Sequence, residues 1–357
     1  ILLVLRWNNG VYSLLMNSKK NNLTRREFLK LIGLGTCAAL LQSIPLSKVL
    51  ANKDVPKLGR VARRDWPVFE EPNIKSRRKY GLNLDQVIPI LETIVLTNDI
   101  GHSETWYRLA EDEFVSGALI QLVENRRNVS NAPIPEQGSL GEITMPAIDV
   151  YLQPRGQKTS QRYYYGSTYW VKKRVLDEFG VPWYELPDDV NGVLYYVRAY
   201  AVHLVEPEEI APLSPEVPAE QKRILVNLRD QRAIAFENER EVFSTLISSG
   251  LPGMFTPIGT FMTFHKRPSR RMFLFAGDPK MDYDFPGVPW VNYITQDGVA
   301  IHGAYWHANW GNPMTHGCIS MPTEDAKWIY RWTTPVVPFD ETYHIADTGT
   351  RVDVIIG

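Results

Sequence analysis

The sequence predicts a mainly β protein, and three observations support this fold class. Aromatic residues make up 11% of the chain, which also contains 25 prolines and 24 glycines, a composition typical of short strands joined by turns. Several segments alternate apolar and polar side chains with the period of two that strands require. In the carboxy-terminal part, residues 323–332 are the one segment with helical spacing, so we expect a single short helix there.

The first fifty residues have the pattern of an export signal. Residues 24–30, TRREFLK, place a paired arginine before an apolar run that is too short to cross a bilayer, and the small residue Ala51 follows at a suitable cleavage position. The segment resembles a twin-arginine leader, so we predict a signal peptide over 16–51 and no stable membrane span after its cleavage. A retained membrane anchor and a lipid on Cys37 are the alternatives. Residues 1–15 lack the charge pattern of a leader.

Two similar stretches follow the leader. Trp106-Tyr107-Arg108-Leu109 recurs as Trp183-Tyr184-Glu185-Leu186, and each copy precedes two further short apolar segments. Two copies are too few for a solenoid. They resemble bacterial SH3-like modules, so we predict two small β-barrels, the first with its leading segment over 52–130 and the second over 140–207. The resemblance implies binding to the cell wall, whereas the simpler interpretation places both tryptophans in the barrel cores.

A further β domain follows a linker. Residues 208–221 are rich in proline and glutamate without apolar periodicity, which predicts an extended linker. Alternating strands are expected over 224–228 and 233–236, and residues 351–356 close the sheet. We therefore predict a β-rich domain over 222–357.

The helix predicted over 323–332 has a start signal and an apolar face. Thr323 suits the N-cap position, and Glu324 and Asp325 follow in the first turn, where acidic side chains stabilise a helix. The apolar face consists of residues spaced three and four apart, namely Ala326, Ile329 and Tyr330.

Cys318 is the one cysteine that remains if the leader is removed, and exported thiols are usually oxidised. A disulfide-linked dimer, a buried inert thiol and a catalytic nucleophile are the three interpretations. Three of the seven histidines lie shortly before Cys318 in the sequence, namely His302, His307 and His316. Because an imidazole or a helix N-terminus can lower a thiol pKa from about 8.5 to roughly 3.5–7.5, we expect an activated thiol. The same four residues could instead form a zinc site, although their spacing matches no familiar pattern.

The segments Ile301-His302-Gly303 and Thr315-His316-Gly317-Cys318-Ile319, followed by a short helix, resemble the signature of the L,D-transpeptidases of bacterial cell walls. The resemblance covers residues 223–357 and leaves out the two modules. It implies donor and acceptor stem peptides of peptidoglycan as partners and no cofactor. It also implies that the Cys318 thiolate attacks the diaminoacyl–D-alanine bond, releases D-alanine and passes the acyl group to an amine.

Residue by residue, the resemblance implies that Cys318 is the nucleophile and His302 the general base, with the Gly303 backbone orienting the imidazole. His316 would shape the site or donate a hydrogen bond to the substrate, and the N–H groups of Gly317 and Cys318 would form an oxyanion hole. Ser320 stands where many family members carry Asn or Arg. The aromatic loop after Gly303 either walls the peptide groove or packs as core. The expected substrate-contacting residues are Tyr305, Trp306, His307, Trp310, Thr315 and Ser320.

The net charge and two further alternatives limit the functions that the sequence allows. The 39 basic and 40 acidic residues nearly cancel, so nucleic acid is not an expected partner. We expect the basic cluster around Pro268 to be a solvent-exposed hairpin tip, and contact with substrate carboxylates or an anionic wall polymer is the alternative. The cluster consists of Lys266, Arg267, Arg270 and Arg271. Two other functions stay open: a carboxypeptidase that passes the acyl group to water at Cys318, and a non-catalytic wall-binding scaffold. The expected location is the cell wall, the periplasm or the extracellular face of a bacterium.

Overall fold

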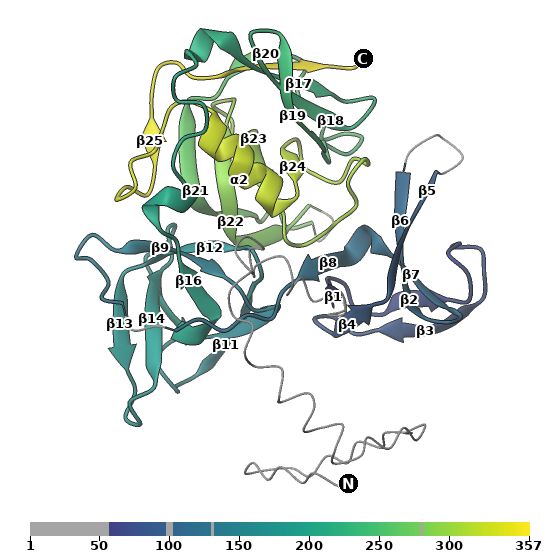
Figure 1. Ribbon diagram of the computed structural model, residues 1–357. Coiled ribbons are helices and arrows are strands. Elements are labelled where there is room, and N and C mark those ends of the chain that lie inside the picture. Colours follow the sequence, from purple (N-terminus) through teal and green to yellow (C-terminus); the bar gives the residue numbers. More distant parts are fainter. Residues whose placement is uncertain (1–56, 98–102, 130–131, 279–280) are drawn as a thin grey trace, which may run out of the picture. The chain divides into compact units, whose positions relative to one another are not determined.

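A computed structural model describes residues 57–97, 103–129, 132–278 and 281–357 (Figure 1). The predicted leader over 16–51, with Cys37, lies outside these residues. Within the described ranges the structure contains strands β1 to β26 and one α-helix, α2 (Thr323–Trp332), which confirms the mainly β prediction. None of the helices in these ranges is long and apolar enough to cross a membrane. Residues 56–357 cluster as a single unit, so their elements are described together.

The first module consists of two sheets. A short 3₁₀ turn, η2 (Gly117–Leu119), connects a strand of one sheet to a strand of the other. The three-stranded sheet has the order β4-β1-β8, and the five-stranded sheet has the order β3-β2-β7-β6-β5. The strands are β1 (Lys57–Val61), β2 (Trp66–Phe69), β3 (Arg78–Leu82), β4 (Val87–Ile90), β5 (Glu92–Thr97), β6 (Ser103–Ala110), β7 (Glu113–Ser116) and β8 (Ile120–Val123).

The second module repeats this topology strand for strand. Its sheets have the orders β12-β9-β16 and β11-β10-β15-β14-β13, with the 3₁₀ turn η3 (Ala199–Ala201) in the place of η2. The strands are β9 (Ser139–Ile143), β10 (Ala147–Tyr151), β11 (Lys158–Tyr164), β12 (Thr168–Val171), β13 (Lys173–Leu176), β14 (Pro182–Pro187), β15 (Leu194–Arg198) and β16 (Val202–Leu204).

The sequence repeat therefore corresponds to a structural repeat. Trp106 lies on β6 and Trp183 lies on the equivalent strand β14, and each side chain is 1% exposed. Both tryptophans are thus core residues of their modules. The sheets of the described residues are open, without a closed barrel among them, so the SH3-like barrel assignment stays a prediction.

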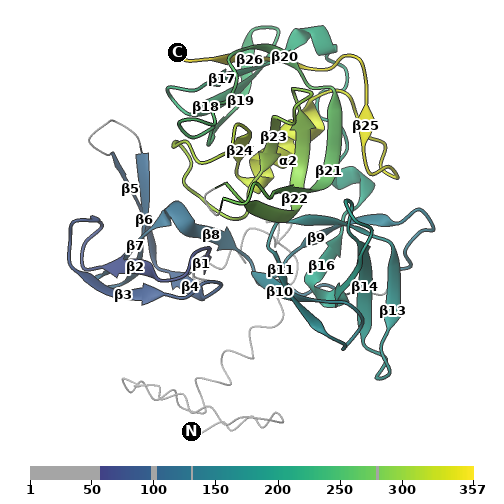
Figure 2. The same ribbon diagram turned by 180° about the vertical axis from the view of Figure 1, so that it is seen from behind.

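The carboxy-terminal domain also has two five-stranded sheets, with the orders β19-β18-β17-β26-β20 and β24-β23-β22-β21-β25. Helix α2 packs on β22, β23 and β24, as both views show (Figures 1 and 2). The strands are β17 (Lys222–Asn227), β18 (Arg232–Glu237), β19 (Arg240–Leu246), β20 (Gly259–Met262), β21 (His265–Leu274), β22 (Tyr283–Tyr293), β23 (Ala300–Gly303), β24 (Ile319–Met321), β25 (His344–Ile345) and β26 (Arg351–Ile355).

Helix α2 has the predicted bounds but a different start. Pro322 occupies the cap position and no side chain caps the helix, whereas Thr323 is already the first helical residue, so its assignment as N-cap was wrong. Proline has no N–H to leave unpaired and suits the start of a helix. The expected apolar face is confirmed, since Ala326, Ile329 and Tyr330 are all buried.

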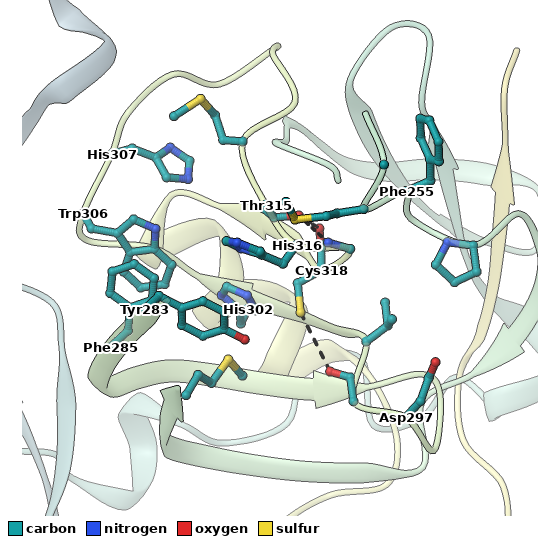
Figure 3. A pocket seen from close by; sticks show the side chains of 18 of the residues that line it. Phe255, Tyr283, Phe285, Asp297, His302, Trp306, His307, Thr315, His316 and Cys318 are labelled. Carbon is teal, nitrogen blue, oxygen red and sulfur yellow. Dashed lines mark hydrogen bonds between the residues drawn. The ribbon is translucent and has the colours of Figure 1, made fainter. Parts of the chain in front are cut away.

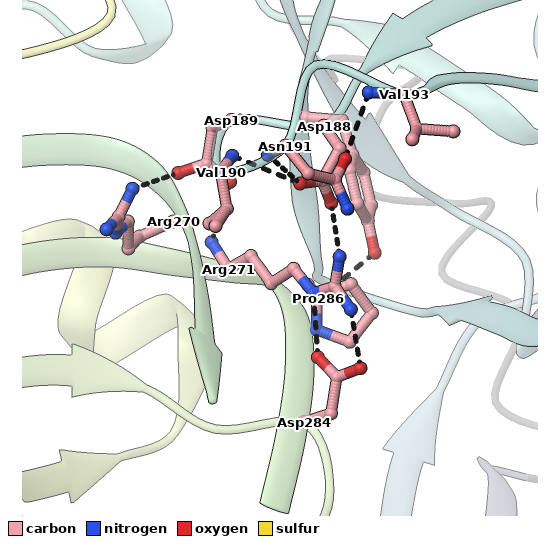
Figure 4. Close-up of polar contacts among 10 residues, drawn as sticks. Asp188, Asp189, Val190, Asn191, Val193, Arg270, Arg271, Asp284 and Pro286 are labelled. Atoms are coloured by element: carbon pink, nitrogen blue, oxygen red, sulfur yellow. Dashed lines mark hydrogen bonds and ion pairs between the residues drawn. The ribbon is translucent and has the colours of Figure 1, made fainter. Parts of the chain in front are cut away.

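The basic cluster is not a solvent-exposed hairpin tip, because its residues lie along β21. Lys266 is 1% exposed, and its ammonium donates to the carbonyl oxygens of Tyr330 (2.6 Å) and Thr333 (2.8 Å) at the end of α2. Arg271 donates to both carboxylate oxygens of Asp284 and to Asp188 of the second module (Figure 4). These cations are held inside the protein by carbonyl and carboxylate groups.

The segment between the second module and the carboxy-terminal domain contains two 3₁₀ turns, η4 (Pro207–Glu209) and η5 (Ala219–Gln221). It packs on the last turn of α2, where the Leu213 N–H donates to the Arg331 carbonyl (3.0 Å) and the Arg331 side chain donates to the Ala211 carbonyl (2.9 Å). Residues 210–213 are therefore bound along the helix.

Candidate active site

A cavity of about 580 Å³ opens where β22 and β23 meet the loop that carries the motif cysteine (Figure 3). Parallel pairing of β23 with β24 sets Ile301 opposite Ile319 and His302 opposite Ser320, which brings the two motif segments side by side. The candidate base and the candidate nucleophile therefore come from neighbouring strands. Of the predicted site residues, those that line the cavity are His302, Trp306, His307, Thr315, His316, Gly317 and Cys318.

Cys318 is the residue immediately before β24, and its partly buried side chain packs against Val288, Val291 and Ala300. Its Sγ lies 3.8 Å from the Gly298 carbonyl oxygen (Figure 3). Burial raises the pKa of the thiol to about 11, which a hydrogen bond from the Ala300 backbone opposes and the charge of Asp297 reinforces. The expected lowering of the thiol pKa is wrong for this structure, because burial outweighs the opposing hydrogen bond from the Ala300 backbone.

His302 lies within β23, at 3% exposure, rather than at the end of a strand. Its Nδ1 is 3.0 Å from the carbonyl oxygen of Gly303. A carbonyl oxygen only accepts, so this contact places the hydrogen on Nδ1 and leaves Nε2 as a basic acceptor. Burial lowers the pKa of His302 to about 4, although the Gly303 contact opposes the shift, so the imidazole is neutral near pH 7.

Hydrogen bonds with two threonine hydroxyls stabilise the turn before Cys318. Thr315 Oγ1 accepts from the Gly317 N–H (3.2 Å) and donates to the Cys318 carbonyl (2.6 Å), while Thr256 Oγ1 donates to the Gly317 carbonyl (2.9 Å). Gly317 has a φ of +118°, a conformation that favours glycine. Because the Gly317 N–H already has a partner, its use as an oxyanion donor requires exchange of the Thr315 contact.

Aromatic rings form one wall of the cavity. Trp306 stacks on Phe285 at 3.9 Å between ring centroids and lies 5.9 Å from the His302 ring, and Tyr283 lies 4.8 Å from the His316 ring (Figure 3). This wall is apolar and lies directly beside the candidate nucleophile and base.

His307 is a buried part of the same wall. Its Nε2 lies 3.3 Å from Ser320 Oγ, its Nδ1 has no hydrogen-bond partner within the described part of the chain, and burial lowers its pKa to about 3. A neutral imidazole with a free nitrogen is thus present at the cavity.

Four predicted site residues do not line the cavity. Tyr305 is 2% exposed, and its hydroxyl donates to the Pro286 carbonyl (2.6 Å). Ser320 lies behind His307 and donates to the Ser248 carbonyl (3.4 Å), and the Trp310 ring packs on His307 at 4.6 Å. Gly303 is covered by α2, since a Cβ there would come within 3.0 Å of Thr323.

Several lining residues were absent from the prediction. Tyr283 and Phe285 alternate along β22, so the period of two could have identified them as one face. Asp297 lies in the turn before β23, and Leu119 comes from η2 of the first module. No sequence signal connects Leu119 to the cysteine motif. The others are Gly253, Met254, Phe255, Pro257, Met272, Gly298, Val299 and Met314.

A zinc site was the alternative interpretation of Cys318 and the three histidines before it. Among the described residues, no group of three or more His, Cys, Asp or Glu side chains is arranged to hold a metal ion.

The carboxy-terminal part of the chain is similar to known proteins. Residues 221–354 match the YkuD family model, described as an L,D-transpeptidase catalytic domain. The Bacillus subtilis (strain 168) protein named "Putative L,D-transpeptidase YciB" is 28% identical in an alignment of 128 residues, and the match covers 32% of this chain and 63% of that protein. The chain thus spans less than two thirds of the length of this curated relative.

Two solved structures each match 38% of the chain. The NMR structure of the catalytic domain from an E. faecium L,D-transpeptidase is 26% identical, with a TM-score of 0.31, and the match covers 38% of this chain and 98% of that one. The Ldtfm–avibactam carbamoyl enzyme is 25% identical, with a TM-score of 0.31, over 38% of this chain and 49% of that one.

Proposed function

We propose that this chain is a peptidoglycan L,D-transpeptidase with Cys318 as its nucleophile and His302 as its general base. The family match over residues 221–354 supports the reaction class. The observation that carries the assignment of roles is the contact between His302 Nδ1 and the Gly303 carbonyl, because it leaves Nε2 as a base in the cavity that also contains the Cys318 thiol. Donor and acceptor are stem peptides in this proposal.

The proposed reaction begins from an uncharged pair. With pKa values of about 11 for Cys318 and about 4 for His302, thiol and imidazole are both neutral at pH 7. The thiol proton therefore moves to His302 Nε2 as Sγ attacks the carbonyl carbon between the diaminoacyl residue and D-alanine. The imidazolium then protonates the departing amine of D-alanine, and a thioester remains on Cys318.

The second half-reaction restores the enzyme. An amine of a neighbouring stem attacks the thioester carbonyl, His302 accepts the proton that this amine loses, and the thiol leaves with that proton. The energy of the original amide bond is carried by the thioester, so no nucleotide is consumed. Trp306, Phe285 and Tyr283 form an apolar wall that would restrict water at the thioester and favour the amine.

We also propose export to the cell wall and wall binding by the two modules. Export is supported by the TRREFLK sequence of residues 24–30. Trp106 and Trp183 are buried in the module cores, so a wall ligand would contact other residues.

Intact-mass spectrometry tests the reaction. Purified protein and its Cys318→Ala and His302→Gln variants are incubated with a muropeptide tetrapeptide and, separately, with a carbapenem. We expect an acyl adduct and released D-alanine with the wild type, no adduct with Cys318→Ala, and an acylation rate lowered roughly 10²- to 10⁴-fold in His302→Gln. His344→Gln, which alters a histidine outside the cavity, is the matched control.

The products identify the acceptor. Cross-linked dimers in the presence of an acceptor stem support transfer, whereas tripeptide alone would assign the alternative carboxypeptidase reaction to the same cysteine. A folded wild-type protein that forms no adduct with either reagent would favour the wall-binding scaffold.

A further inference from the structure

A buried arginine of the first module contacts the loop that follows the candidate base. Arg60 lies on β1 and is 2% exposed. Its Nη2 donates to the backbone carbonyl of Tyr305 at 2.7 Å, and these residues are 245 positions apart in the sequence. Tyr305 immediately precedes Trp306, which lines the cavity beside His302.

The guanidinium of Arg60 is fixed by further contacts. Its Nε and Nη2 donate to Gln121 Oε1 at 3.0 and 2.9 Å, its Nη1 donates to Asp85 Oδ1 at 3.0 Å, and it lies 4.2 Å from the centre of the Tyr164 ring. Every nitrogen of the planar fork thus has a partner, which lysine with its single ammonium could not reproduce.

Residues of the second module bind Asp85 and Gln121, the two side chains that accept hydrogen bonds from Arg60. The other oxygen of Asp85 accepts from Arg162 at 2.7 Å, and Gln121 donates to the Tyr165 carbonyl at 2.8 Å. Tyr164, whose ring contacts Arg60, also stacks on Tyr305 at 5.6 Å. Both modules therefore fix the position of the arginine that contacts the loop.

A separate contact holds the loop three residues further on. The N–H of Ala308 donates to the Ala118 carbonyl of η2 at 2.8 Å, and the next residue of η2, Leu119, lines the cavity. The first module is thus bonded to the loop at positions 305 and 308, on either side of Trp306 and His307.

We propose that Arg60 is a positioning residue of the active site, which holds loop 304–311 so that Trp306 and His307 form the wall beside His302 and Cys318. The first module is then part of the active site in addition to any binding function of its own. The effect of Arg60 on the loop stands on the contacts alone, whereas its effect on acyl transfer rests on the proposed function.

Hydrogen exchange measured by mass spectrometry tests the effect on the loop without relying on activity. In Arg60→Met and Arg60→Lys, amides of 304–311 are expected to exchange at least about tenfold faster than in the wild type, since the loop loses its contact at Tyr305. Peptides of α2, residues 323–332, should keep wild-type rates. Unchanged protection of 304–311 in both variants would overturn the proposal.

The matched control is Arg198→Lys, because Arg198 lies in the second module, over the Trp183 ring at 4.2 Å and 3.5 Å from Asp177. This substitution disturbs a module arginine without touching the loop, so exchange in 304–311 should not change. If Arg60→Met does not fold, Gln121→Leu removes the acceptor of two Arg60 hydrogen bonds and retains the Arg60–Asp85 pair, and the same acceleration in 304–311 is expected.

Kinetics then separate positioning from general stability. Acylation of Arg60→Lys by the tetrapeptide should fall roughly 10- to 100-fold in kcat/KM at a temperature where the variant is fully folded. Alkylation of Cys318 by iodoacetamide, which needs no peptide groove, should stay within about twofold of the wild type. Acylation at the wild-type rate despite a loosened loop would overturn the catalytic part. A wild-type protein that is never acylated would contradict the proposed function and leave the exchange result standing.

Discussion

Cys318 and His302 show how burial determines the ionisation of the two reacting side chains. The thiol pKa is raised to about 11 and the imidazole pKa is lowered to about 4, so each group keeps its uncharged form across the neutral range. A preformed thiolate–imidazolium pair requires the opposite order of the two pKa values. Proton transfer must then accompany the attack on the carbonyl.

The pH dependence of acylation follows from His302. The base is active when neutral, and its lowered pKa means that it remains neutral until the pH falls to about 4. We expect kcat/KM for tetrapeptide acylation to change little between pH 7 and about 5 and to fall tenfold per unit below about pH 4. Rates of adduct formation from about pH 3 to 8 measure this, and half-loss near pH 6.5 would contradict it.

Asp297 affects the reactivity of the thiol through its charge. This exposed carboxylate contributes to the raised pKa of Cys318, so Asp297→Asn should lower that pKa. Because solvent screens the carboxylate, we expect iodoacetamide to alkylate the variant only about two- to threefold faster at pH 8. Asp340→Asn, at an exposed position outside the cavity, is the control. Slower alkylation of Asp297→Asn would contradict the assigned sign.

The motif made Cys318 and His302 identifiable, but their ionisation was not predictable. Sequence neighbours show which imidazoles lie near the thiol, whereas the pKa depends on how much water each group loses on folding. That loss is determined by Val288, Val291 and Ala300 around the sulfur, which come from strands distant in sequence from the cysteine. Likewise, the hydrogen-bond partners of Tyr305 are Arg60 and Pro286, which no sequence pattern connects to it.

Among the elements, helix α2 is stabilised most clearly at its carboxy-terminal end. Lys266 donates to the carbonyls of Tyr330 and Thr333, and Lys222 donates to that of Trp332 at 3.0 Å. These carbonyls lack partners within the helix, and positive charge there also complements the helix dipole. The two lysines therefore act as a buried C-terminal cap.

Removal of this cap should destabilise the domain. In Lys266→Met two buried carbonyl oxygens lose their donor, and part of that cost is offset because a buried ammonium is removed. We expect the free energy of unfolding to fall by roughly 1–3 kcal/mol in urea titrations at pH 7. Lys75→Met, at an exposed position, should unfold as the wild type does. Equal stability of Lys266→Met and wild type would mean that the cap contributes nothing.

Most elements were predictable because their signals are local. The strands around 224–228, 233–236 and 351–356 and the bounds of α2 follow from periodicity and are confirmed. The error at Thr323 arose because two adjacent residues both suit a helix start. Burial of Lys266 could not be foreseen, since its partners are carbonyls 64 and 67 residues away.

At the scale of the whole molecule, the second module and the carboxy-terminal domain share one core. Leu140 and Val205 of the second module are 1% and 2% exposed and belong to the same apolar cluster as Ile224, Ile301 and Trp332. Thr168 Oγ1 also donates to the Pro268 carbonyl at 2.7 Å. The family match begins at residue 221, but the packing does not stop there.

A shortened chain should show this dependence. Residues 221–357 alone would expose the apolar surface that Leu140 and Val205 cover, a packing contact worth roughly 3–6 kcal/mol, whereas residues 132–357 would retain this contact. We expect a lower melting temperature and stronger binding of an apolar dye for 221–357 than for 132–357. Equal melting of both fragments would show that the shared core contributes little.

Acid should destabilise the protein through its buried histidines. His302 and His307 have pKa values of about 4 and about 3, below the unfolded value near 6.5, so the unfolded chain binds more protons in this interval. Their contribution is fully present above pH 6.5 and is lost as the pH falls toward 4 and 3, on the order of 3 kcal/mol or more for each. Urea unfolding from pH 7 to 4 measures the slope. His307→Gln should flatten it, while His344→Gln should not.

Contacts between distant segments limit what the sequence could predict at this scale. The repeat of Trp106 and Trp183 revealed two equivalent modules, and the structure confirms their common topology. Leu119 at the cavity and Arg60 at the loop belong to no motif, and each is an ordinary residue until the modules and the carboxy-terminal domain are packed together.

The position of β26 has a consequence for how the domain forms during synthesis. This strand pairs in parallel with β17 and antiparallel with β20, so it lies inside its sheet although it is translated after the other strands of the described residues. Pairing over such a sequence separation is slow, and unpaired strand edges invite wrong partners. Until residues 351–355 leave the ribosome, β17 and β20 each lack a neighbour. A nascent chain stalled before that point already carries Cys318 and His302 but cannot complete this sheet, whose Val352 and Val354 pack in the same apolar cluster as Ile301 and Ile319 beside the two site residues.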